Sequence, residues 1–148
     1  MPRHSTVLPA VTTRALAVRW TRWQAVHYFR LSADQGFAQA QHDVGSCYSD
    51  GTGGLVQDWD MAVRLWRQAV EKGNADAQSN LGVCYAHGRS VTQNDQEAVR
   101  LWRLAVEQGH VGAWGSLGVS YLFGTGAAQD LEASVHHIRL AADQGVAR

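Results

Sequence analysis

Hydrophobic residues recur at helical spacing along the chain, in short segments that come in pairs. In one segment, Ala77, Leu81, Cys84 and Tyr85 fall at positions i, i+4, i+7 and i+8, which places them on one face of a helix. The following segment, 98–105, has apolar residues at i, i+3, i+4 and i+7, which also fits the 3.6-residue period of a helix. The pattern therefore predicts pairs of amphipathic helices and an all-α fold.

The helix pairs repeat with a period of about 36 residues. Equivalent positions of successive units form columns, and a regular period of this length is typical of stacked repeats. We expect a half unit at about residues 22–36 and full units at about 38–73, 74–109 and 110–145. The columns that carry the repeat are Gly36, Gly73, Gly109 and Gly145; Gly45, Gly82 and Gly118; Tyr48, Tyr85 and Tyr121; Gly51, Gly88 and Gly124; and Phe29, Trp66, Trp102 and Ile138.

The expected helix ends carry capping residues. Asp58, Asn94 and Asp130 stand where a side-chain oxygen accepts the free N–H groups of each second helix, and Asn74 has the same place before a first helix. Asn94 and Glu97 also have capping-box spacing. The glycine that recurs after each second helix suits a left-handed C-terminal cap.

A glycine also recurs in the middle of each first helix, at Gly45, Gly82 and Gly118. Such a glycine costs about 1 kcal/mol relative to alanine, so its position needs a reason. We expect a bulky residue of the paired helix, from the column that contains Trp66 and Trp102, to pack against it.

Charge and composition divide the chain unevenly. The 148 residues suit one domain, and 13 basic and 13 acidic residues balance, so the overall charge favours neither nucleic acid nor membrane binding. Residues 1–33, however, contain five arginines and no acid. We expect a tail at residues 1–12, either disordered or an organelle-targeting segment, before a repeat domain at 13–148.

Membrane insertion and a disulfide framework are not expected. No apolar run approaches the roughly 18 residues of a membrane helix. Cys47 and Cys84 are the only cysteines, and they occupy the same column of neighbouring first helices. A cytoplasmic location is therefore predicted, with targeting to an organelle through the arginine-rich N-terminus as the alternative.

The columns resemble the Sel-one-like repeat, a relative of the tetratricopeptide repeat. The pattern is Ala-x-x-x-Leu-Gly-x-x-Tyr-x-x-Gly followed by Asp/Asn-x-x-x-Ala-x-x-Leu-Trp-x-x-Ala-x-x-x-Gly, and residues 77–109 are its best copy. The resemblance implies a right-handed α-solenoid of antiparallel helix-turn-helix repeats, with the first helices on a concave surface. It also implies a role as an adaptor in protein complexes. Some members join the two helices of a unit by a disulfide, an arrangement from which Cys47 and Cys84 depart.

No motif indicates catalysis, a cofactor or a metal. His136 and His137 are neighbours on a helix and point about 100° apart, so they do not readily share a metal ion. Gly124-Thr125-Gly126 lacks the third glycine of a dinucleotide fingerprint and follows a helix. We therefore predict no catalytic residues, no cofactor, no metal site and no enzymatic activity.

Partner-binding residues are expected at the first-helix positions that do not face the core. Polar and acidic residues occupy one end of this surface and apolar residues the other, which suits a peptide with a basic part and an apolar part. Trp59 and Trp114 lack aromatic counterparts in their columns and are expected to be partly exposed contact residues. The predicted concave-face residues are His42, Ser46, Asp50, Ser79, Asn80, Val83, His87, Ser116, Val119 and Phe123.

Function is accordingly predicted as non-catalytic adaptor or scaffold activity toward a partner protein or peptide. Two alternatives remain: the chain is a fragment of a larger repeat scaffold, or the repeats frame a hydrolase site. Self-association through open ends of the stack is a further prediction, because no polar terminal repeat is visible in the sequence.

Overall fold

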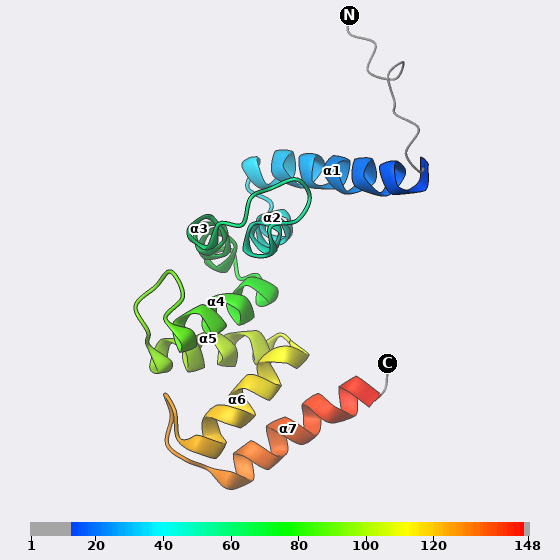
Figure 1. The fold of residues 1–148 in the computed structure, drawn as a ribbon. Helices are drawn as coiled ribbons and strands as arrows, with labels where there is room; N and C mark the ends of the chain where they lie inside the picture. Colours follow the sequence, from blue (N-terminus) through cyan, green and yellow to red (C-terminus); the bar gives the residue numbers. More distant parts are fainter. Residues whose placement is uncertain (1–12, 147–148) are drawn as a thin grey trace, which may run out of the picture.

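Paired helices make up the protein, as the computed structural model shows for residues 13–146, with side chains described for 22–145 (Figure 1). The predicted tail at 1–12 lies outside the described residues. The described part contains no strand, so the all-α prediction is confirmed. None of its helices is both long and apolar enough to cross a bilayer. The helices are α1 (Thr13–Asp34), α2 (Ala38–Asp50), α3 (Trp59–Glu71), α4 (Ala75–His87), α5 (Asp95–Glu107), α6 (Val111–Phe123) and α7 (Leu131–Val146).

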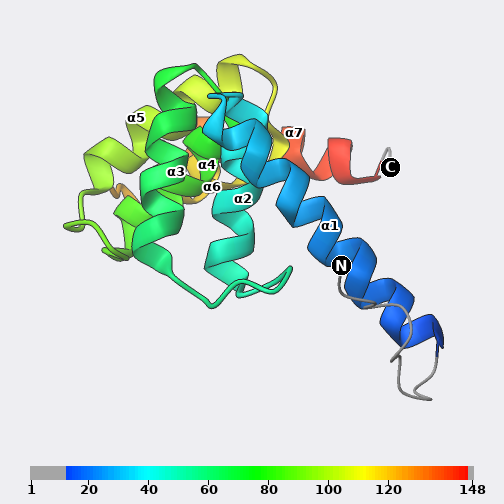
Figure 2. The same cartoon turned by 90° about the horizontal axis from the view of Figure 1, so that it is seen from above.

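The helices form a solenoid in which each one packs mainly against its neighbours in sequence (Figures 1 and 2). Within units, α2 pairs with α3, α4 with α5 and α6 with α7, while α3 meets α4 and α5 meets α6 between units. Helix α1 lies against α2 and extends beyond it. The core is a series of small clusters along the stack, built from alanine, leucine, valine and the tryptophans Trp66 and Trp102.

The glycine in each first helix makes room for a large side chain of the second helix, as predicted. A Cβ added at Gly45 would lie 2.7 Å from Nε1 of Trp66, and one added at Gly82 would lie 2.6 Å from Nε1 of Trp102. Both distances are shorter than real contacts allow. The two indoles are 3% and 6% exposed. The recurring glycine is therefore a packing requirement of the helix pair.

The bulky column is more exposed at the two ends of the stack than in its middle. A Cβ at Gly118 would lie 2.5 Å from Cγ1 of Ile138, so the contact exists in the last unit, yet Ile138 remains 41% exposed. Phe29, the first member of the bulky column, is 39% exposed. The predicted left-handed cap at Gly145 is wrong, because α7 continues through this residue to Val146.

Side-chain caps fix the starts of the second helices. Asp58, Asn94 and Asp130 each accept the backbone N–H three residues ahead, at 3.1, 3.1 and 3.0 Å. The capping box expected from Asn94 and Glu97 is only half formed. The Glu97 carboxylate binds the guanidinium of Arg100 instead, at 2.5 and 2.9 Å, and this contact lowers the pKa of Glu97.

Side chains at the end of each second helix join successive units. Gln108 donates to the carbonyl oxygen of Gly73 at 2.9 Å and to the side-chain oxygen of Gln78 at 3.0 Å. One unit earlier, Lys72 donates to Gly36 O and to Gln41 Oε1. These contacts fix the register between units, which in turn aligns their first helices.

Candidate binding groove

Two cavities adjoin across the first helices. One, of about 410 Å³, lies between α2, α3 and α4, and the other, of about 700 Å³, lies between α4 and α6. Val83 and His87 line both cavities, so the two meet at these residues. We call them together the first-helix groove.

Most of the predicted partner-binding residues line the first-helix groove. The first cavity contains Ser46, Asp50 and Asn80, and Val83 and His87 form the boundary between the two cavities. Ser116, Val119 and Phe123 line the second cavity. Three successive units thus contribute equivalent first-helix positions to one continuous surface.

Two predicted residues do not line the groove. Ser79 is 7% exposed, and its carbonyl oxygen accepts the indole N–H of Trp102 at 3.2 Å, so this position belongs to the helix interface. His42 has a side chain that is 14% exposed and lies 3.0 Å from Asn80 through Nε2. Its imidazole joins the first helices of neighbouring units. The column shared by His42 and Ser79 therefore faces the packing surface, contrary to the prediction.

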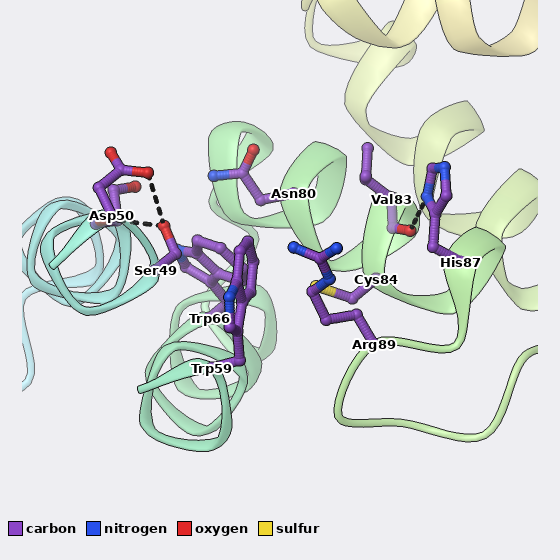
Figure 3. A pocket seen from close by; sticks show the side chains of 10 residues that line it. Ser49, Asp50, Trp59, Trp66, Asn80, Val83, Cys84, His87 and Arg89 are labelled. Carbon is purple, nitrogen blue, oxygen red and sulfur yellow. Dashed lines mark hydrogen bonds between the residues drawn. The ribbon is translucent and has the colours of Figure 1, made fainter. Parts of the chain in front are cut away.

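An aromatic and cationic wall stands on one side of the first cavity (Figure 3), and the sequence predicted only Trp59 of this wall as a contact residue. Trp59 meets Trp66 edge to face at 6.3 Å between ring centroids, and the Arg89 guanidinium lies 4.3 Å from the centroid of the Trp59 ring. Trp59 and Trp66 are seven residues apart on α3, so their shared face was visible in the spacing. Arg89 follows the end of α4, and threonine occupies its column in the other two units.

Opposite charges stand on different elements around the first cavity. Asp50 ends α2, and its carboxylate accepts a hydrogen bond from Ser49 Oγ at 3.4 Å. Arg89 makes no ion pair with any residue that the structure describes. Burial raises the pKa of the nearby Cys84 thiol, and the positive charge of Arg89 partly offsets that rise. The cavity is therefore polarised, whereas the sequence predicted only an acidic end.

The second cavity presents apolar side chains to solvent, with Asp95 as the one acidic residue among the described residues that line it. Val83 is 42% exposed, Val119 49% and Phe123 69%. Isolated exposed apolar residues are common, but these three line one hollow, on first helices whose opposite faces are buried in the core. Such a surface can bury an apolar side chain of another molecule.

Comparison with known proteins identifies the family to which this chain belongs. The profile of the Sel1 repeat matches residues 24–37, 38–74, 75–110 and 116–146, which is most of the chain. The chain belongs to the Sel1 repeat family. No curated protein is significantly similar to it.

Solved Sel1 repeat structures share this arrangement. A protective antigen of uropathogenic Escherichia coli strains, which displays an SLR fold, is 37% identical with a TM-score of 0.77, over 84% of this chain and 26% of that one. A Sel1 repeat protein from Oxalobacter formigenes is 28% identical with a TM-score of 0.76, over 84% and 50%. Cysteine rich protein B of Helicobacter pylori, at 16% identity, TM-score 0.63 and coverage of 86% and 91%, shows the fold alone. The chain thus spans a quarter and a half of the first two proteins.

The Sel1 repeats of this chain hold their cysteines as free thiols, with Cys84 buried and Cys47 partly buried. His137 packs on the Tyr121 ring at 5.4 Å and bonds to Ala133 O at 2.8 Å through Nδ1, while His136 is exposed. Across the described residues, no three His, Cys, Asp or Glu side chains gather as a metal ion would require.

One group within these Sel1 repeats has the residue types of a hydrolase triad, which sequence analysis overlooked. Ser46 Oγ lies 3.4 Å from His42 Nε2, and His42 Nδ1 lies 3.1 Å from Asp43 Oδ1. However, the Asn80 amide is closer to Nε2, at 3.0 Å, and the Ser46 hydroxyl donates to the His42 carbonyl at 3.1 Å. The base is therefore already engaged in a contact that joins α2 to α4, and the nucleophile in a hydrogen bond within α2.

Proposed function

We propose that this Sel1 repeat protein is a non-catalytic adaptor that binds a partner protein through a peptide segment in the first-helix groove. The observation that carries the proposal is the joining of two cavities along equivalent positions of three units, with exposed Val83, Val119 and Phe123 in one hollow. An extended groove of this kind is the usual binding surface of stacked repeats. The family's general role as an interaction scaffold supports the same conclusion.

The test is affinity purification followed by mass spectrometry, with the wild type beside the Val83→Asp/Phe123→Asp double variant. The two new carboxylates should abolish capture of the partner, because a bound apolar side chain would bury them without a counter-ion, which is costly. A control variant, Val56→Asp/Leu31→Asp, places the same charges at exposed apolar positions outside the groove. Circular dichroism should show all three proteins folded. Capture that survives in the groove variant would remove the groove from consideration, and a wild type that captures nothing specific would remove the adaptor role.

The hydrolase alternative rests on Ser46, His42 and Asp43. Because Ser46 and His42 are engaged elsewhere, we expect no covalent labelling of Ser46 by a fluorophosphonate probe, with trypsin as the positive control. Stoichiometric labelling that is lost in Ser46→Ala would favour a hydrolase. Self-association through the ends of the stack stays a separate prediction, for which sedimentation at several protein concentrations is the measurement.

A further inference from the structure

We propose that the first-helix groove selects a peptide in which a basic residue, an acidic residue and an apolar residue follow one another in that order. This inference rests on the proposed function and specifies its ligand. Asp50 would face the basic residue, Arg89 the acidic residue, and the hollow formed by Val83, Val119 and Phe123 the apolar residue. The partner is thus an extended segment of a protein with a mixed charge pattern.

Asp50 favours a cation for two independent reasons. Its carboxylate is exposed, accepts a hydrogen bond from the Ser49 hydroxyl at 3.4 Å and forms no ion pair with a residue that the structure describes. It is also the last residue of α2, at the negative end of the helix dipole. A lysine or arginine side chain of a ligand would relieve both sources of negative potential.

Arg89 favours a carboxylate. Its guanidinium rests against the face of Trp59 at 4.3 Å, and a cation–π contact leaves the N–H edge free to donate. Among the described residues it is the only Arg or Lys that lines either cavity, and none of their carboxylates pairs with it. Figure 3 shows Arg89 on the far side of the two tryptophans from Asp50. Two ligand residues of opposite charge can therefore enter the first cavity side by side.

The order of the three ligand positions follows from the repeat. Asp50, His87 and Phe123 are equivalent residues of successive units. The order of the units therefore sets the order of the chemical groups along the groove. The bond between His42 and Asn80 shows that neighbouring first helices approach each other, and we take the step between them as about 8–10 Å, the usual distance between helix axes. An extended peptide advances roughly 3.3 Å per residue. The basic and apolar residues should therefore lie about five or six positions apart, with the acid between them.

The experiment uses a phage-displayed library of random 12-residue peptides, selected on the full chain. The wild type should enrich peptides with the basic–acidic–apolar order. Arg89→Glu should convert the acidic preference to a basic one, and Asp50→Lys should convert the basic preference to an acidic one, each without changing the other position. The matched controls, Arg64→Glu and Glu107→Lys, make the same charge changes at exposed positions that do not line the groove, and should select wild-type sequences.

A synthetic copy of the most enriched peptide then gives the size of the effect by fluorescence anisotropy. Because Arg89 is exposed, loss of its charge pair should raise Kd by about twofold to fivefold in Arg89→Met. Enriched peptides without the acidic residue, or peptides whose preference ignores both charge reversals, would overturn the inference while leaving the binding groove intact. Failure to enrich any peptide, or enrichment that survives Val83→Asp/Phe123→Asp, would overturn the proposed function as well.

Discussion

Replacing Gly82 by alanine should destabilise the protein, although alanine is the better helix former. The added Cβ would lie 2.6 Å from Nε1 and 2.8 Å from Cδ1 of the Trp102 indole. The indole has little room to move, because it is 6% exposed and its N–H is bonded to Ser79 O at 3.2 Å. Either the two helices separate or the indole gives up its hydrogen bond.

The size of the effect follows from three terms. Overpacking of a tight core costs about 1–3 kcal/mol. Losing the indole hydrogen bond adds about 0.5–1.5 kcal/mol. The helix preference of alanine over glycine returns about 1 kcal/mol. The net expectation is a loss of about 0.5–3.5 kcal/mol in the free energy of unfolding, and a fall in Tm of about 2–4 °C for each kcal/mol.

Gly115 supplies the matched control, because it is also a mid-helix glycine but its added Cβ meets no atom within 4 Å. Gly115→Ala should raise the free energy of unfolding by up to about 1 kcal/mol. Urea denaturation followed by circular dichroism at 222 nm measures both variants. If Gly82→Ala matched or exceeded the wild type in stability, the contact between glycine and tryptophan would not be what holds the helix pair together.

Three further outcomes are expected. Asn94→Ala should lower the free energy of unfolding by about 1 kcal/mol in urea titration, because α5 loses its N-terminal cap. Iodoacetamide at neutral pH should modify Cys47 well before Cys84 in timed mass spectra, because Cys84 is buried and its thiol pKa is raised by that burial; equal rates would contradict this. The lowered pKa of Glu97 means that its contact with Arg100 stabilises the fold at neutral pH and is lost as pH falls through the folded-state value. Glu97→Gln should therefore reduce the stability lost between about pH 5 and pH 3, and thermal melts across that range will show whether it does.

The fold was accessible from sequence because its determinants recur. The spacing of Gly82 and Trp102 indicated a contact that the structure contains, and Asp58 and Asn94 cap the helices that they were expected to cap. Each of these contacts is local to one unit. Repetition shows such a determinant several times in the sequence, so the pattern stands out from chance.

The groove was harder to predict from the sequence, because its chemistry depends on contacts between units. Periodicity predicts which face of its helix a residue lies on. It does not predict which residues of the next unit contact that face. Ser79 was assigned to the surface and is buried beside Trp102. Arg89 lies in a loop, outside any helical pattern, and only the folded chain brings its guanidinium to Trp59. Gly145 was also mispredicted, at the end of the stack. The equivalent glycines follow the ends of the other second helices, whereas α7 continues through Gly145.

Columns that repeat and columns that vary therefore have different roles in this protein. The glycine and bulky columns are under the same packing constraint in every unit, since a Cβ at Gly45, Gly82 or Gly118 would meet a side chain of the paired helix. The column of Asp50, His87 and Phe123 is free of that constraint and changes from carboxylate to imidazole to phenyl along the groove. Substitution there can alter ligand choice at little cost in stability. Ligand specificity in such a stack is thus carried by the residues that break the repeat, on a scaffold that the repeating residues hold in place.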